Sequence, residues 1–256
     1  QGESLRALEV STSLLEKLAV ESPEQSRVRH ELAKTYFFRS KPLEVTRQYA
    51  DAEKYARRAV QVGKELLQAA PENADYQATV ALSMHQLGHI LGHVGSRAEA
   101  VAEHRNSRDI YRMLRAKFPQ RFQYLIQLAH AYDHLAVLLH EEGDNAQAEA
   151  ESLAAIAMLE EAALRADNNA DVVDSPGYLL GAAHLHFGDF LSSHERNSEA
   201  EKSYGEARIL MTEQVHAFPD VGHYQFLLGK VCLSLAKLFL KEQRQEEARG
   251  LLEQAL

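Results

Sequence analysis

Histidine is the residue type with the clearest capacity for chemistry in this chain. The stretch MHQLGHILGH places His85, His89 and His93 at every fourth position, and HAYDH repeats the spacing with His130 and His134. On a helix, residues four apart lie on one face. Neutral imidazoles at this spacing suit Zn²⁺, Cu²⁺ or Ni²⁺, whereas protonated imidazoles hold anions near pH 6.

Three interpretations of these histidines stay open at this point. The imidazoles can be partly buried, hydrogen-bonded residues between packed helices, or polar groups of a surface that docks a peptide. They can also be metal ligands, with His85 paired with His89 and His130 paired with His134. If protonated histidines hold an anion, the affinity for acidic peptides should rise as the pH falls from about 7.5 to about 6.

No motif of a catalytic centre accompanies the histidines. Asp133, between His130 and His134, suits acid–base chemistry, but no nucleophile stands with it. The sequence has no G-x-x-x-x-G-K-[ST] loop and no kinase signature such as H-R-D or D-F-G. We therefore expect no catalytic residue, no cofactor and no enzymatic activity. A catalytic domain such as a kinase would have to lie elsewhere in a longer protein.

Composition narrows the class of protein further. The net charge is −9, from 28 basic and 37 acidic residues, which disfavours binding to nucleic acid or to an anionic membrane. No apolar run reaches the roughly 18 residues needed to insert into a membrane. Cys232 is the only cysteine and lies in an apolar stretch, so we expect a buried, inert thiol and a cytoplasmic protein.

A repeat of 48 residues accounts for the elements that must position the histidines. Pro23, Pro71, Pro119 and Pro219 are separated by 48, 48 and 100 residues. Each unit contains two helices, the first beginning about five residues after its proline and the second ending at the next proline. Small residues recur in the same register, where we expect them to let the two backbones approach closely. They are Gly88, Ala136, Gly188 and Ala236 and, twelve residues later, Ala100, Ala148, Ala200 and Ala248.

The repeat predicts an all-α solenoid of about ten or eleven antiparallel helices, stacked as one domain over residues 1–256. Because the helix faces at both ends lack a covering unit, we expect self-association that increases with concentration. Sedimentation that shows only monomer at every concentration would contradict it. The predicted units are a partial unit 1–23, full units 24–71, 72–119, 120–169 and 170–219, and a truncated unit 220–256.

The pattern resembles the tetratricopeptide repeat, W-x2-L-G-x2-Y followed by A-x3-F and P. Leu87-Gly88, with Leu91 and Ala100, matches its central part, while Met84 stands at the tryptophan position. The period is 48 residues here and 34 in that repeat. The elongated units are similar to those in C-terminal extensions of bacterial serine/threonine protein kinases. The resemblance implies a right-handed superhelix.

The resemblance also implies that the first helix of each unit lines a concave groove that binds a peptide or a protein surface. We therefore expect a non-catalytic interaction scaffold. The alternatives are a regulatory or docking segment of a larger bacterial signalling enzyme, such as a serine/threonine kinase, and a histidine-lined groove that binds metal or responds to pH. Transferred by register, the groove residues are Lys34, Phe38, His85, Gln86, His89, His93, His130, Asp133, His134, His186, Asp189, Lys230, Ser234, Lys237 and Lys241.

Overall fold

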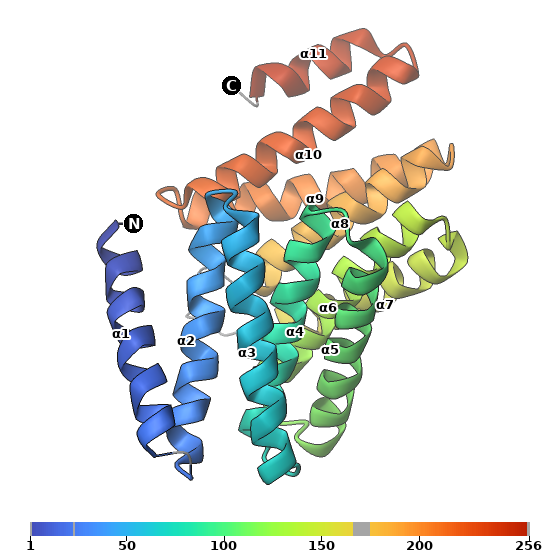
Figure 1. Cartoon of the computed structure of the whole chain (residues 1–256). Helices are drawn as coiled ribbons and strands as arrows, with labels where there is room; N and C mark the ends of the chain where they lie inside the picture. Colours follow the sequence, from blue (N-terminus) through green and yellow to red (C-terminus); the bar gives the residue numbers. More distant parts are fainter. Residues whose placement is uncertain (1, 23, 166–174, 255–256) are drawn as a thin grey trace. The chain divides into compact units, whose positions relative to one another are not determined.

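The computed structural model describes residues 2–22, 24–165 and 175–254. Within these residues the chain forms eleven helices and no strand, so the all-α prediction is confirmed (Figure 1). The helices are α1 (Gly2–Glu21), α2 (Ser26–Val45), α3 (Tyr49–Ala69), α4 (Ala74–His93), α5 (Arg97–Lys117), α6 (Phe122–Glu142), α7 (Asn145–Arg165), α8 (Pro176–Ser193), α9 (Asn197–Ala217), α10 (Gly222–Lys241) and α11 (Gln245–Gln254).

The prolines mark the helix boundaries, with one difference from the prediction. The first helix of a pair begins three residues after its proline, not five, as α4 does at Ala74 after Pro71. The reason is a local cap, because the Asn73 side chain accepts hydrogen bonds from the backbone N–H groups of Asp75 and Tyr76. Those N–H groups have no acceptor within the helix, so the cap lets the helix begin at once.

The boundary between the third and fourth full units, at residues 169 and 170, lies outside the described residues. At the near end of α8, the hydroxyl of Ser175 accepts a hydrogen bond from the N–H of Tyr178, and Pro176 opens the first turn. A proline is well tolerated there because the first helical residue needs no N–H. Serine and proline therefore define the beginning of α8.

The chain divides into two compact units, residues 1–138 and 139–256, with the boundary inside α6. Helices that follow each other in the sequence pack together, for example α2 with α3 and α4 with α5 in the first unit, and α8 with α9 in the second. First helices also contact each other, α2 with α4 and α8 with α10. Each of the two compact units therefore has a surface built from first helices. That the whole chain is one domain, and where its repeat units begin and end, stay predictions.

The small residues of the repeat are buried, but the two glycines accommodate rings. A Cβ atom on Gly88 would lie 2.7 Å from Cδ2 of His104, and one on Gly188 would lie 2.5 Å from Cε1 of Tyr204. Both rings come from the second helix of the pair. We expected two backbones to approach each other closely at these glycines. In the structure, a side-chain ring of the second helix packs against the backbone of the first helix instead. The buried small residues are Gly88, Ala100, Ala136, Ala148, Gly188, Ala200, Ala236 and Ala248.

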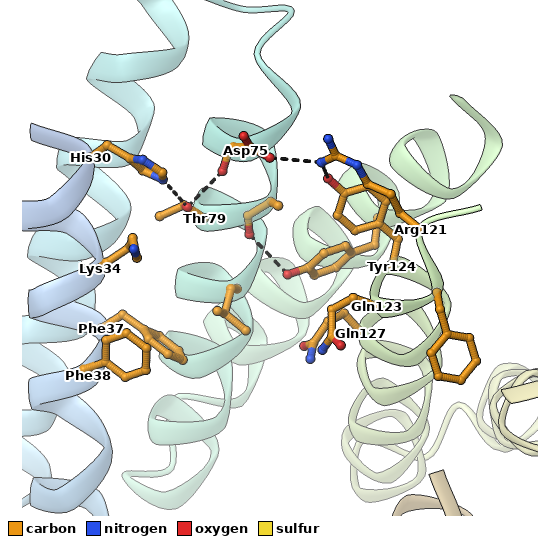
Figure 2. Close-up of a pocket in the computed structure, with 14 residues that line it drawn as sticks. His30, Lys34, Phe37, Phe38, Asp75, Thr79, Arg121, Gln123, Tyr124 and Gln127 are labelled. Atoms are coloured by element: carbon orange, nitrogen blue, oxygen red, sulfur yellow. Dashed lines mark hydrogen bonds and ion pairs between the residues drawn. The ribbon is translucent and has the colours of Figure 1, made fainter. Parts of the chain in front are cut away.

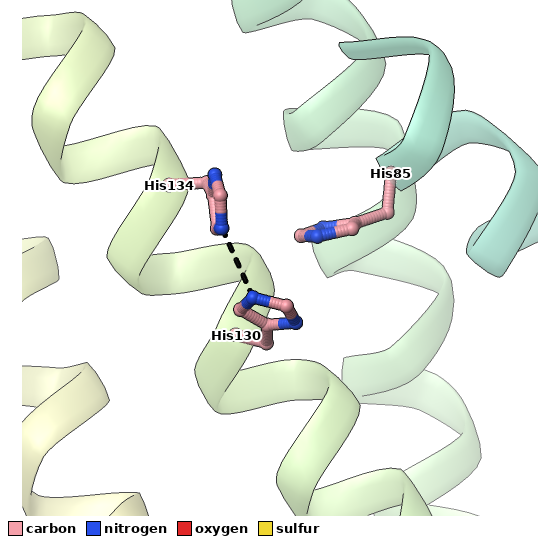
Figure 3. Close-up of side chains that lie close together, drawn as sticks. All are labelled: His85, His130 and His134. Atoms are coloured by element: carbon pink, nitrogen blue, oxygen red, sulfur yellow. Dashed lines mark hydrogen bonds between the residues drawn. The ribbon is translucent and has the colours of Figure 1, made fainter. Parts of the chain in front are cut away.

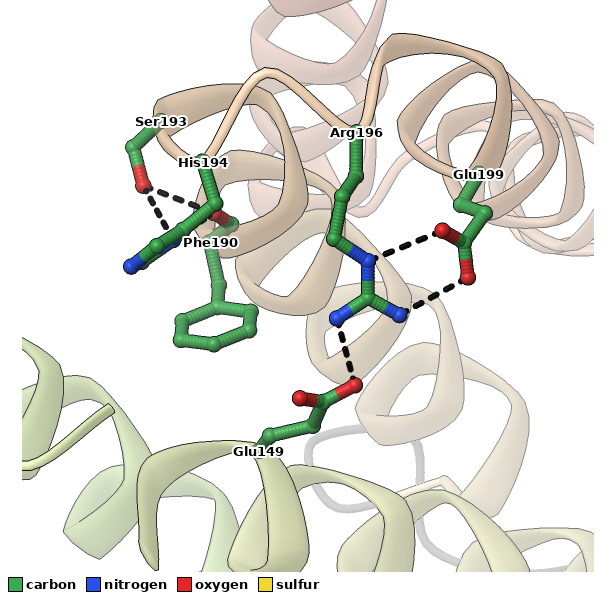
Figure 4. A network of polar contacts seen from close by, with 6 residues as sticks. All are labelled: Glu149, Phe190, Ser193, His194, Arg196 and Glu199. Carbon is green, nitrogen blue, oxygen red and sulfur yellow. Dashed lines mark hydrogen bonds and ion pairs between the residues drawn. The ribbon is translucent and has the colours of Figure 1, made fainter. Parts of the chain in front are cut away.

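Two arginines 48 residues apart repeat one contact between successive second helices. Arg196, next to the start of α9, donates to Glu149 of α7 at 2.6 Å and to Glu199 of α9 at 2.8 Å (Figure 4). These hydrogen bonds hold the pKa of the guanidinium above its usual range. Arg244 repeats both contacts with glutamates of α9 and α11. The repeat in the sequence is therefore also a repeat of polar contacts.

The part of the chain that the structure describes has no helix with the length and apolarity needed to cross a bilayer. Cys232 is buried in α10, as expected, and burial raises the pKa of its thiol. A line of apolar side chains on α1 is exposed: Val10 (70%), Leu14 (57%) and Leu18 (37%) follow each other at four-residue spacing. This stripe is compatible with the expected self-association, which stays a prediction.

Candidate functional site

In the first unit, side chains of α2, α4, α5 and the start of α6 enclose a pocket of about 510 Å³ (Figure 2). Most of its apolar surface comes from the first helices, with Tyr111 contributed by α5. The apolar lining comprises Phe37, Phe38, Ala78, Leu82 and Phe122. The polar lining comprises His30, Lys34, Asp75, Thr79, Arg121, Gln123, Tyr124 and Gln127.

Polar contacts between helices hold the rim of the pocket in place. A hydrogen bond of 2.8 Å joins His30 Nε2 of α2 to Thr79 Oγ1 of α4. Arg121, just before α6, donates to Asp75 of α4 at 3.0 Å and to the hydroxyl of Tyr124 at 2.7 Å. Burial lowers the pKa of His30, which favours the neutral ring. The three first helices are thus tied together near their N-terminal ends.

The floor of the pocket leaves aromatic surface exposed to water. Phe37 is buried, and its ring meets that of Phe38 edge to face at 5.2 Å. Phe38 is 49% exposed although it contacts the pocket. Lys34 lies one turn earlier on the same helix and also lines the pocket. Two of the residues transferred by register, Lys34 and Phe38, therefore lie together here.

The second unit has a polar counterpart, a pocket of about 420 Å³ between α8 and α10. The Tyr204 hydroxyl donates to Asp189 Oδ1 at 2.7 Å, and burial together with this hydrogen bond raises the pKa of Tyr204. The structure brings four of the predicted groove residues into this pocket, with two ammonium groups near a carboxylate. They are Asp189, Ser234, Lys237 and Lys241.

A cluster of imidazoles lies between α4, α5 and α6 of the first unit. The ring of His85 in α4 points toward His130 and His134 of α6, with ring centroids 4.5 and 5.0 Å away (Figure 3). A hydrogen bond of 3.0 Å joins the Nε2 atoms of His130 and His134. His104 of α5 meets His85 edge to face at 4.9 Å. We call these four residues the imidazole cluster.

Within the imidazole cluster, His85 and His104 are buried and His130 and His134 are half-buried. His85 is 7% exposed and His104 is 1% exposed. Neither ring nitrogen of His104, nor Nδ1 of His85, has a hydrogen-bond partner among the described residues. Burial lowers the pKa of His104 to about 3, and the pKa of His85 and His134 well below the usual range. These three rings are therefore neutral at pH 6, contrary to what the anion-binding hypothesis requires of them.

His89 and His93 belong to a different group, centred on Glu44 at the end of α2. Oε1 of Glu44 is hydrogen-bonded to His89 Nδ1 and lies 3.7 Å from His93 Nε2, while Oε2 accepts from Gln86 at 2.6 Å. Burial alone would raise the pKa of Glu44, but these contacts lower it overall. The ligand atoms of the predicted pair His85 and His89 therefore belong to two different groups, although the ring of His89 also meets that of His134 at 4.7 Å. His130 and His134 remain together.

Three predicted residues lie neither in a pocket nor in one of the two histidine groups. Asp133 is buried in α6, His186 is half-buried in α8 and Lys230 is exposed on α10. Conversely, sequence reasoning missed Glu44 and His104. His104 follows Ala100 by four positions, where the tetratricopeptide pattern has its late aromatic residue. The position of His104 in the repeat could therefore have indicated that its ring faces Gly88.

No protein-family model and no curated protein matches the sequence. Solved structures with the same fold exist. BtubC (BKLC) from P. vanneervenii is 13% identical, with a TM-score of 0.67 over 99% of this chain and 89% of that chain. A Rap protein in complex with Competence and Sporulation Factor is 14% identical, with a TM-score of 0.64 over 97% of this chain and 64% of that chain. RapI in its apo form is 13% identical, with a TM-score of 0.62 over 87% of this chain and 68% of that chain.

At these identities the similarity concerns the fold, which is a TPR-like α-solenoid of paired helices. The resemblance stated from the 48-residue repeat is thereby confirmed at the level of the fold. The link to kinase extensions and the cytoplasmic location stay predictions.

Proposed function

We propose that the chain is a non-catalytic scaffold that binds a peptide or a protein surface along the first helices of the first unit. The pocket of about 510 Å³ is the anchor site. Its volume falls in the range of about 300–1,000 Å³ that is usual for ligand sites, and its lining combines apolar surface with a few polar groups. The half-exposed ring of Phe38 is the observation that carries the proposal.

The chemistry of the pocket defines the partner it fits. An aromatic or branched aliphatic side chain, inserted beside Phe38 and Leu82, would remove apolar surface of both partners from water. The carboxamides of Gln123 and Gln127 can donate to and accept from the backbone of a bound peptide. The cationic groups at the rim already have acidic neighbours, so an apolar anchor, not net charge, dominates recognition.

The structural comparisons support the binding role without naming the partner. A Rap protein with a similar fold has been solved in complex with Competence and Sporulation Factor. Because the identity is 14%, the ligand of that protein is not transferred to this chain. The partner class follows instead from the apolar floor and polar rim of the pocket.

A peptide selection tests the proposal. Random peptides displayed on phage are selected on the wild-type chain, and the affinities of the enriched sequences are measured by fluorescence anisotropy. We expect enriched peptides to share an apolar residue and to bind the Phe38→Glu variant at least about tenfold more weakly, a loss of about 1.4 kcal/mol. A carboxylate on the pocket floor would have to be desolvated under the bound side chain.

The matched control is Phe226→Glu, the same substitution at a phenylalanine of α10 that is 71% exposed. It should leave the affinities unchanged. Failure to enrich any peptide, or equal affinities for the wild type and the Phe38→Glu variant, would refute the pocket as the anchor site.

A further inference from the structure

We propose that His85, His130 and His134 form a binding site for a divalent transition-metal ion of the Zn²⁺ class. The site lies beside the peptide pocket and does not depend on the proposed function.

The three side chains already converge. One ligand atom from each of them lies within 4.8 Å of the others. A tetrahedral Zn²⁺ ion with nitrogen ligands at about 2.0–2.1 Å needs nitrogen atoms about 3.3 Å apart. The Nε2 atoms of His130 and His134 are 3.0 Å apart. Ring rotations that move each nitrogen by less than about 1 Å would complete this geometry.

Two helices fix the ligands in this arrangement. His130 and His134 stand four residues apart on one face of α6, and His85 faces both from α4 (Figure 3). Their rings already contact one another, so little side-chain freedom is lost when an ion binds. Because the proposed ligands come from α4 and α6, a bound ion would also stabilise the packing of these two helices.

Unpartnered nitrogens are the second, independent observation. Nδ1 of His85 and both ring nitrogens of His104 are buried without a hydrogen-bond partner in the described part of the chain. Buried polar groups are normally hydrogen-bonded, and coordination of an ion would satisfy a ring nitrogen of His85. His104 lies next to two of the three ligands, with ring centroids 4.9 Å from His85 and 5.5 Å from His134.

The donor set selects the class of ion. Three neutral imidazoles suit Zn²⁺, Cu²⁺ or Ni²⁺, whereas Mg²⁺ and Ca²⁺ require oxygen ligands. Three protein ligands leave a fourth position for water or for another group. Glu44, His89 and His93 form a second group of converging ligand atoms. There the carboxylate already bonds to His89 and Gln86, so the unpartnered nitrogen of His85 favours the site of His85, His130 and His134.

Calorimetric titration of the chelator-treated chain with Zn²⁺ tests the proposal. We expect saturable binding of one ion per chain at the site of His85, His130 and His134. His134→Gln should weaken the binding by more than about 100-fold, because loss of even an outer partner of a ligand costs about 10–100-fold. His93→Gln and the exposed remote control His216→Gln should leave the affinity unchanged. Circular dichroism checks that each variant is folded.

X-ray absorption of the Zn²⁺-loaded wild type keeps the test independent of folding of the variants. We expect at least three imidazole nitrogens at about 2.0–2.1 Å around the ion. Absence of saturable binding by the wild type would overturn the proposal. So would binding that is lost in His93→Gln and kept in His134→Gln, since the ion would then occupy the group around Glu44.

Discussion

Acidification from pH 7.5 to pH 5.5 should lower the free energy of unfolding of the chelator-treated chain by at least about 1.4 kcal/mol. The cause is the burial of His85, His104 and His134, which lowers the pKa of all three in the folded state. In the unfolded chain the pKa of each histidine returns to about 6.5. Below that value the unfolded state binds more protons than the folded state, so acid favours unfolding.

The stabilisation by these neutral rings is complete above pH 6.5 and is lost as the pH falls toward the folded values, about 3 for His104. His104 contributes about 1.4 kcal/mol per pH unit in this interval, and His85 and His134 act in the same direction. The neighbouring groups act in the same direction, because His130, His104, His89 and Lys41 all disfavour protonation of His85. His104 alone therefore accounts for a loss of about 1.4 kcal/mol at pH 5.5, and His85 and His134 add to this loss.

Urea unfolding followed by circular dichroism at pH 7.5, 6.5 and 5.5 measures this effect. His104→Leu removes one buried titrating ring and should reduce the acid-induced loss by about 1.4 kcal/mol. His216→Gln, which replaces an exposed histidine of α9, should leave the loss unchanged. Equal stability of the wild type at pH 7.5 and pH 5.5 would show that these rings are not buried in neutral form.

Gly188→Ala should destabilise the chain by about 1–2 kcal/mol, although alanine favours a helix by up to about 1 kcal/mol over glycine. The added Cβ atom would lie 2.5 Å from Cε1 of Tyr204. That ring cannot move away easily, because it is 2% exposed and its hydroxyl donates to Asp189. The steric cost therefore exceeds the gain in helix propensity.

Two further variants separate a clash with the ring from a close backbone approach. In a Tyr204→Ala background, Gly188→Ala should stabilise the chain, because the ring that opposed the methyl group is absent. Gly205→Ala, in the middle of α9 with no atom within 4 Å of the added Cβ, should stabilise by up to about 1 kcal/mol. If Gly188→Ala destabilises equally with and without Tyr204, the neighbouring backbone is responsible. Thermal or urea unfolding provides these values.

The sequence was sufficient to predict the paired helices because the signals for them are local. Pro71 and Pro119 delimit α4 and α5, and the alanines of the repeat mark the buried faces of the helices. Side chains that share a face could also be predicted, as the hydrogen bond between His130 and His134 shows. Contacts within one helix depend only on the 3.6-residue period.

Contacts between helices could not be predicted in the same way. Glu44 lies 45 residues before His89, and no periodicity connects the end of α2 with the middle of α4. His104 reaches His85 only because Gly88 leaves room for its ring. Arg121 of the peptide pocket lies in the turn before α6 and bonds to Asp75 of another unit of the repeat. Such contacts depend on how neighbouring helices cross.

The peptide pocket and the imidazole cluster share two helices. Leu82 and His85 are one turn apart on α4, and Gln127 and His130 are one turn apart on α6. Because both proposed sites are built on α4 and α6, we expect an occupant of one to change the affinity of the other. If a bound metal ion changes the affinity for the peptide by some factor, thermodynamic linkage requires that the bound peptide change the affinity for the metal ion by the same factor.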